Sequence, residues 1–161
     1  GLRFFTVYGP WGRPDMALFL FTKAILEQKP IQIFNNGDLL RDFTYIDDII
    51  ESLIRVINKI PQKKENFNNK DLDSSLSWAP YRIFNIGNSK ATPLMELIDC
   101  LENSLKIKAK KDFLPMQPGD VKITSADTSL LENWIDFKPN TPVKIGVDNF
   151  VSWYKKYNNI E

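Results

Sequence analysis

Apolar residues along this chain alternate between two spacings, one typical of strands and one typical of helices. Residues 2–8 are a run of aromatic and β-branched side chains, and residues 82–86 have a similar composition, so both predict strands. Residues 46–57 and 94–105 instead repeat apolar side chains at i, i+3, i+4 and i+7, which predicts two amphipathic helices. Helices that alternate with strands predict an α/β fold.

Turn-forming residues place the boundaries of further elements. Asn35-Asn36-Gly37 separates short apolar runs at 31–34 and 41–45, so we expect an antiparallel hairpin there and hence a mixed sheet. Asp15 is positioned to cap a helix over residues 16–28. The remaining expected features are an N-cap at Thr92, a helix cap at Asp47-Asp48, an exposed loop at 62–80, a strand near 108–114, a turn at 117–120, and helices after Asp127 and after Thr141-Pro142.

Composition restricts the class of protein. The 161 residues suit one domain, and 21 basic against 20 acidic side chains leave a net charge of +1, which argues against recruitment of nucleic acid or of an anionic membrane. The apolar runs are too short to span a bilayer, and the N-terminus has no signal-peptide pattern, so we expect a cytoplasmic protein. With Cys100 alone and no histidine, a disulfide framework, a Cys or His metal site and a His-activated nucleophile are excluded.

Two lone arginines stand out in polar turns that follow predicted strands, where ligands of α/β proteins bind. Arg13 and Arg41 lie beside apolar residues in a chain whose other cations are mostly lysines, and a guanidinium suits phosphate or carboxylate. The alternative is a surface ion pair, of Arg13 with Asp15 and of Arg41 with Asp42 or Asp38. The spacing leaves both interpretations open and favours the ion pairs.

Four strings in this order, GLRFFTVYGPWGRPDM, FNNGDLLRDFTYIDDI, APYRIFNIGN and MQPGDVKITSAD, closely resemble the C-terminal half of UDP-glucuronate 4-epimerases, which are extended short-chain dehydrogenases/reductases. The resemblance covers essentially the whole chain. It implies that residues 1–161 are the C-terminal, substrate-binding portion of a Rossmann-type protein, a small mixed sheet with helices, in which residues 1–15 are a late Rossmann strand and its loop. The chain does not begin with Met, and we expect an NAD-binding N-terminal domain before Gly1.

The resemblance also implies roles for single residues. Thr6 and Arg13 match the residues that hold the carboxylate of the sugar, Arg41 matches the arginine on the UDP pyrophosphate, and Asp120 matches the acid on the ribose. The uracil would contact Phe34 and the Ile33 backbone. The turn residue Gln117 departs from the phosphate-binding arginine of related galactose epimerases, which weakens one diphosphate contact or leaves it to another residue. Phe4 and Val7 lie where the family's strand passes the nicotinamide, and the alternative for Phe4, Val7 and Phe34 is core packing.

In such enzymes tightly bound NAD removes hydride from C4 of the sugar and returns it to the opposite face. The catalytic Tyr-x-x-x-Lys pair and the Gly-rich dinucleotide turn do not occur in this sequence, so we name no catalytic residue and expect the chain alone to be inactive. The partners implied are a UDP-sugar and the missing N-terminal portion; the family's homodimer is not assured here.

Two rival functions remain open. The chain could be a non-catalytic UDP-sugar-binding or interaction module from a truncated or split gene. Alternatively, it could belong to a related decarboxylase or dehydratase that acts on the same kind of substrate.

Overall fold

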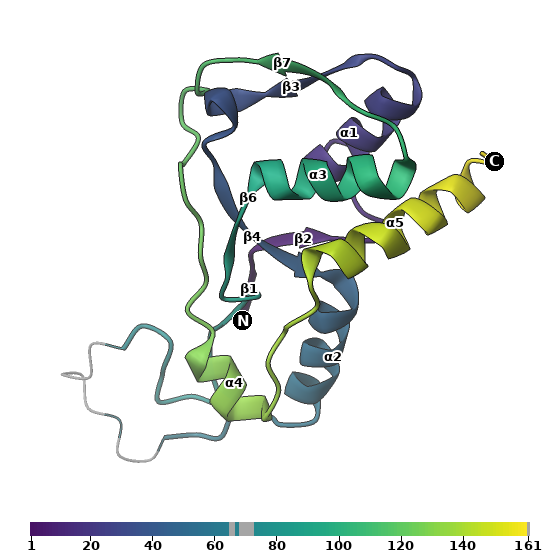
Figure 1. The fold of residues 1–161 in the computed structure, drawn as a ribbon. Coiled ribbons are helices and arrows are strands. Elements are labelled where there is room, and N and C mark those ends of the chain that lie inside the picture. Colours follow the sequence, from purple (N-terminus) through teal and green to yellow (C-terminus); the bar gives the residue numbers. More distant parts are fainter. Residues whose placement is uncertain (65–66, 68–72, 161) are drawn as a thin grey trace.

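A computed structural model describes residues 1–64, 67 and 73–160. The chain folds into a mixed α/β structure, as expected (Figure 1). Its helices are α1 (Ala17–Leu26), α2 (Ile46–Ile57), α3 (Leu94–Leu105), α4 (Ser129–Ile135) and α5 (Val143–Tyr157). Its strands are β1 (Leu2–Phe4), β2 (Thr6–Tyr8), β3 (Pro30–Ile33), β4 (Leu40–Tyr45), β5 (Phe84–Ile86), β6 (Ala91–Pro93) and β7 (Lys110–Phe113), with a 3-10 turn, η1, at Phe34–Gly37.

The strands form three small groups. β2 pairs in parallel with the second half of β4, while β6 pairs antiparallel with its first half. β1 pairs in parallel with β5, and β3 pairs in parallel with β7. The expected run at 2–8 is therefore divided at Phe5 between two strand partners.

The expected hairpin over 31–45 is wrong, although both of its strands exist. Asn35, Asn36 and Gly37 all have positive φ, at 50°, 50° and 82°. The Asn35 side chain also donates to the Asp38 carbonyl at 2.7 Å, which fixes a compact left-handed turn. This turn directs β4 away from β3, and β3 pairs with β7 instead. The β2–β4–β6 sheet is mixed, because β4 pairs in parallel with β2 and antiparallel with β6.

Three expected helix caps are also wrong. Asp15 binds Arg13, and α1 begins after Met16 without a side-chain cap. Thr92 lies within β6, one residue before the N-cap Pro93. The buried Asp48 accepts the backbone N–H groups of Asn140 and Thr141 at 3.2 and 2.9 Å, so it joins α2 to the segment before α5.

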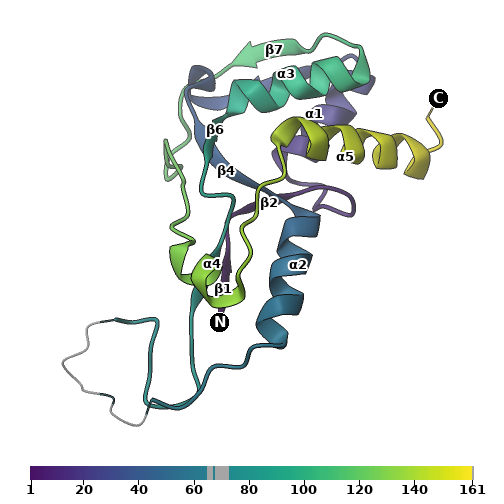
Figure 2. The ribbon, with the colours of Figure 1, turned by 60° about the horizontal axis from the view of Figure 1, so that its bottom comes forward.

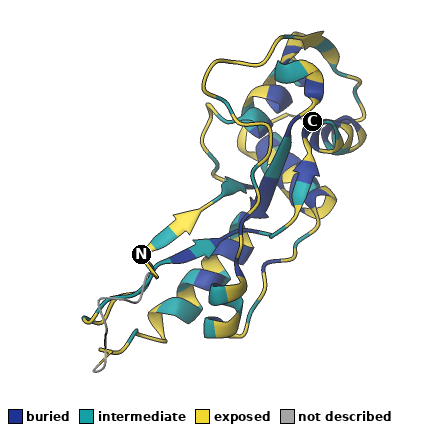
Figure 3. Cartoon of the chain, turned by 90° about the vertical axis from the view of Figure 1, so that its left-hand side faces the viewer, coloured by how far each residue is buried: buried dark blue, intermediate teal, exposed yellow. Residues whose placement is uncertain are grey.

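Two apolar clusters hold the elements together. The larger lies among α1, α3, α5, β3 and β4, and the smaller joins α2 and α4 to β5. In Figures 1 and 2 the helices α3 and α5 lie over the central strands, whereas α2 and α4 lie beside β1. Figure 3 shows buried residues along the central strands and exposed residues on β1. No helix in the described part of the chain is long and apolar enough to cross a membrane.

A buried carboxylate fastens the end of α3 to β7. Glu102 accepts hydrogen bonds from Lys108 and Lys111 and from the Ala109 N–H at 3.1 Å. Burial alone would raise the pKa of this carboxyl, but the three hydrogen bonds outweigh burial and lower the pKa to about 2.

We therefore expect Glu102 to stabilise the fold above its unfolded pKa, with that contribution lost as the pH falls from about 4.5 to 2. Glu102→Gln should lower the free energy of unfolding at pH 7 by about 2–3 kcal/mol and flatten the pH dependence in this window. Urea titrations at pH 7, 4 and 2.5 measure both effects. If the free energy of unfolding changed equally with pH in the unmodified chain and in Glu102→Gln, the role of Glu102 would be contradicted.

Candidate functional site

Arg41 and Asp120, 79 residues apart in the chain, meet at one edge of β4. The segment after the 117–120 turn runs alongside β4: the Leu40 N–H donates to the Lys122 carbonyl at 2.9 Å, and the Thr124 N–H donates to the Leu40 carbonyl at 3.1 Å. Arg41 then donates to Asp120 Oδ1 at 2.7 Å. The expected pairing of Arg41 with Asp42 or Asp38 is wrong, because the partner comes from this distant turn.

The environment of Arg41 keeps its guanidinium in place while part of it remains open. The Arg41 side chain is 16% exposed and that of Asp120 is 32% exposed. Arg41 also donates to the carbonyls of Leu40 and Lys122, at 2.9 and 3.2 Å. Both terminal nitrogens of the guanidinium are thus held by protein acceptors, which fixes its position for an oxyanion that joins or replaces them.

Asp42 is a structural residue of this site that the sequence interpretation missed. It is fully buried, and it accepts the N–H groups of Asn88, Ser89 and Ala126 at 2.7, 3.1 and 2.8 Å. Its own N–H donates to Thr124 Oγ1 at 3.2 Å. Asp42 therefore fixes residues 124–126, which follow Asp120 in the chain and so help to hold Asp120 beside Arg41. The signal available in the sequence was an acidic residue, Asp42, next to the apolar and aromatic residues of a predicted strand.

Arg13 and Asp15 form an exposed pair in the loop after β2, the alternative that the spacing favoured. Arg13 Nε donates to Asp15 Oδ1 at 3.1 Å, and a second nitrogen binds Oδ2. The side-chain hydrogen bond from Arg13 lowers the pKa of Asp15. Gly9 fixes the start of the loop with φ of 136° where a Cβ would lie 2.6 Å from Ile46, and Trp11 packs on Trp153 of α5 at a centroid distance of 5.3 Å.

The other candidate residues lie in different surroundings. The Thr6 hydroxyl is half-buried and has no hydrogen-bond partner among the described residues. Phe34 and Val7 are half-buried against the larger and smaller clusters, whereas Phe4 is 52% exposed and is not core. Ile33 is buried and its carbonyl accepts the Leu114 N–H at 2.9 Å. Gln117 is exposed and opens the turn at Gly119.

None of the buried tyrosines is suited to be a base. Burial raises the pKa of Tyr8, and the nearby Asp48 raises it further. Burial also raises the pKa values of Tyr45 and Tyr154, and that of the Cys100 thiol. A phenolate or thiolate nucleophile needs the opposite shift. Within residues 1–64, 67 and 73–160, no three acidic or Cys side chains are grouped so that they could hold a metal ion.

Comparison with known proteins gives consistent matches. The sequence profile of the NAD dependent epimerase/dehydratase family matches residues 1–87. An uncharacterized 37.6 kDa protein of Escherichia coli O111:H- is 56% identical over 160 residues, which cover 99% of this chain and 48% of that protein. UDP-glucuronate 4-epimerase 1 of Arabidopsis thaliana is 47% identical over 161 residues, covering 98% of this chain and 36% of that protein.

A solved structure has the same fold. The UDP-glucuronic acid 4-epimerase of Bacillus cereus, in complex with UDP-glucuronic acid and NAD, matches 97% of this chain and 45% of its own at 33% identity and a TM-score of 0.78. The chain thus spans about half the length, or less, of the relatives that it matches.

Proposed function

Because this chain belongs to the NAD dependent epimerase/dehydratase family, we propose that it forms the UDP-sugar-binding portion of a UDP-glucuronate 4-epimerase. The observation that carries the proposal is the convergence of Arg41 and Asp120 at the edge of β4, through a 2.7 Å hydrogen bond. A diphosphate would take the guanidinium and a ribose would donate hydroxyl hydrogens to the carboxylate. The 4-epimerases of Arabidopsis thaliana and Bacillus cereus support this choice of reaction.

The loop after β2 would bind the carboxylate of the uronate. Arg13 binds the Asp15 carboxylate through two nitrogens, and a sugar carboxylate would take the same geometry. Both side chains are exposed, so replacing the Asp15 carboxylate by that of the sugar costs little free energy. The Thr6 hydroxyl, which has no partner among the described residues, would donate to the same group. A 4-keto uronate is a β-keto acid, so holding its carboxylate out of line with the ketone would suppress loss of carbon dioxide.

The nicotinamide of NAD would contact the exposed part of β1. Phe4 lies on a strand whose single strand partner among the described residues is β5, and its ring is 52% exposed and free to pack on a nicotinamide. When bound, NAD supplies acceptance and return of hydride at C4 of the sugar. This chain's residues would orient the substrate, and a separate NAD-binding portion would supply the acid–base pair.

Exposed apolar side chains mark where such a portion would dock. Ile50, Ile54 and Ile57 on α2 are 45%, 49% and 63% exposed, and Phe4 of β1, a strand that lies near α2 in Figure 2, is also exposed. Helix and strand faces of this kind are normally covered in an α/β protein.

A chimera tests the reaction. We expect the Bacillus cereus enzyme, with its matched portion replaced by this chain, to convert UDP-glucuronate into a 4-epimer that retains its carboxylate, as seen by NMR of the products. A pentose product with release of carbon dioxide would instead identify a decarboxylase. A correctly folded chimera that binds UDP-glucuronate and NAD but forms no product would leave the binding-module alternative.

Specificity for the carboxylate is tested on the chain itself. Arg13→Ala should weaken UDP-glucuronate binding about tenfold while UDP binding stays unchanged, because a charge-assisted hydrogen bond is lost. Asp15→Asn should strengthen UDP-glucuronate binding a few-fold, because the internal competitor for Arg13 is removed. Calorimetric titrations of each variant with UDP and with UDP-glucuronate measure these affinities. Equal changes for the two ligands would contradict a role of Arg13 in binding the carboxylate.

A further inference from the structure

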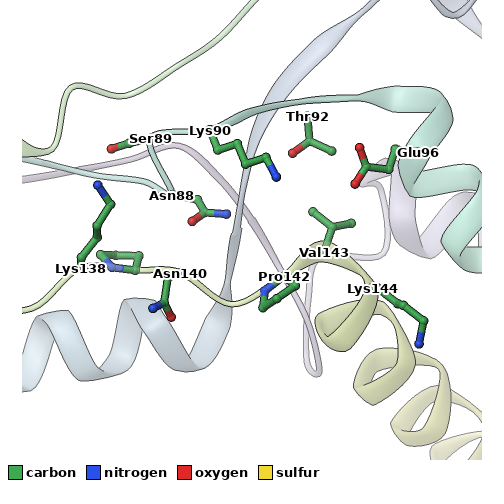
Figure 4. A pocket seen from close by; sticks show the side chains of 11 residues that line it. Asn88, Ser89, Lys90, Thr92, Glu96, Lys138, Asn140, Pro142, Val143 and Lys144 are labelled. Atoms are coloured by element: carbon green, nitrogen blue, oxygen red, sulfur yellow. The ribbon is translucent and has the colours of Figure 1, made fainter.

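A hollow of about 380 Å³, lined by neither Arg41 nor Asp120, lies between the loop after β5, the start of α3 and the segment that leads into α5. Figure 4 shows side chains from all three segments around it. Arg41 is the β4 residue opposite Thr92 in the β4–β6 ladder, but its guanidinium is bound to Asp120 and to the Lys122 carbonyl and does not line the hollow.

Thr92 is the buried polar side chain of this hollow. The residue is 2% exposed, yet it lines the hollow, and in Figure 4 its side chain extends from β6 toward Val143. Its hydroxyl has no hydrogen-bond partner among the described residues. A hydroxyl without a protein partner at the edge of a hollow is available to a bound polar ligand.

Three lysines line the hollow, and they differ in how they are paired. Lys90 has no ion-pair partner in the described part of the chain, and Lys138 is held loosely, at 3.4 Å from Glu132. Lys144 is paired with Asp148 at 3.1 Å, and Glu96 is the one acidic side chain of the lining. Lys90 is therefore the lysine of the lining that is left to pair with an anion.

The N-terminus of α5 adds backbone donors. This helix of 15 residues begins after Pro142 without a side-chain cap, and Val143 and Lys144 of its first turn line the hollow. The Gly146 N–H donates to the Pro142 carbonyl, so the N–H groups of Val143, Lys144 and Ile145 precede the first bond of the helix. Such N–H groups and the helix dipole bind phosphate-like anions.

We propose that this hollow binds a phosphate group, with Lys90, the Thr92 hydroxyl and the first turn of α5 as its ligands. The hollow shares no lining residue with the diphosphate site proposed at Arg41, and its existence does not depend on that function. The group could arrive as inorganic phosphate or as the terminal phosphate of a phosphomonoester, and the volume accommodates either.

The test is a titration of the ¹⁵N-labelled chain with inorganic phosphate at constant ionic strength. We expect saturable shifts of the Val143, Lys144 and Ile145 amide signals, retained in Arg41→Ala. Lys90→Ala should weaken phosphate binding at least about fivefold and Thr92→Val about threefold. Lys110→Ala, which removes an exposed lysine of β7, is the matched control and should change nothing.

Shifts that do not saturate would overturn the proposal, and so would a loss of phosphate affinity in Lys110→Ala as large as that in Lys90→Ala. Loss of the shifts in Arg41→Ala would assign them to the other site and would overturn it as well. A parallel titration with glucose 1-phosphate distinguishes the two sources: competition at the same amides supports a phosphomonoester, and its absence alongside phosphate binding supports the free ion.

Discussion

Replacement of Asp42 with alanine is expected to lower the free energy of unfolding by about 3–5 kcal/mol. The carboxylate is fully buried and accepts three backbone N–H groups, and removing it leaves those donors unsatisfied in a dry environment. The loss should appear in the urea midpoint with an unchanged slope. Because Asp42 also fixes the segment that ends at Asp120, binding of UDP should weaken in the fraction that remains folded.

Two variants control this prediction. Asp38→Ala removes an acidic side chain from the same stretch, but Asp38 is 61% exposed and pairs with Lys122 at the surface, so its loss should cost less than about 0.5 kcal/mol. Asp42→Asn retains one acceptor oxygen and should fall between the two. A loss below about 1 kcal/mol for Asp42→Ala would contradict the role assigned to this carboxylate.

Arg41→Ala is expected to weaken the binding of UDP by about 10- to 100-fold. The expected loss corresponds to charge-assisted hydrogen bonds between one guanidinium and the diphosphate. Arg41→Lys keeps the charge without the planar fork and should lose part of the affinity. Arg3→Ala serves as the matched control, because Arg3 is exposed on β1 and forms no ion pair with the described residues.

The same variants need a check of the fold, since Arg41 also donates to the Leu40 and Lys122 carbonyls. A near-ultraviolet circular dichroism spectrum that matches the unmodified chain would show that packing is intact. An Arg41→Ala protein with this spectrum and with undiminished UDP affinity would remove Arg41 from the site.

Local sequence signals predicted the elements well, since they depend on neighbours in the chain. The spacing at 46–57 and 94–105 matches α2 and α3, and the turn at 117–120 forms as expected, with its positive φ at Gly119. The chain's strand partners were harder to predict. A turn does form at 35–37, but its three consecutive positive-φ residues direct β4 to β2 and β6 and leave β3 to pair with β7.

The site shows the same division. The residues of interest could be named from the sequence, yet their partners could not, because Arg41 and Asp120 are 79 residues apart. Asp42 and Asp48 illustrate the limit most clearly: the pattern treats both as surface acids or caps. In the fold each is a buried acceptor of backbone N–H groups more than 40 residues away.

Calorimetric titration of the unmodified chain with UDP, and in parallel with uridine, tests the central claim most directly. If Arg41 and Asp120 form a diphosphate and ribose site, UDP should bind one to one, and uridine at least about tenfold more weakly, because it lacks the group that the guanidinium recognises. Absence of UDP binding by the folded chain, or equal affinity for UDP and uridine, would contradict the claim.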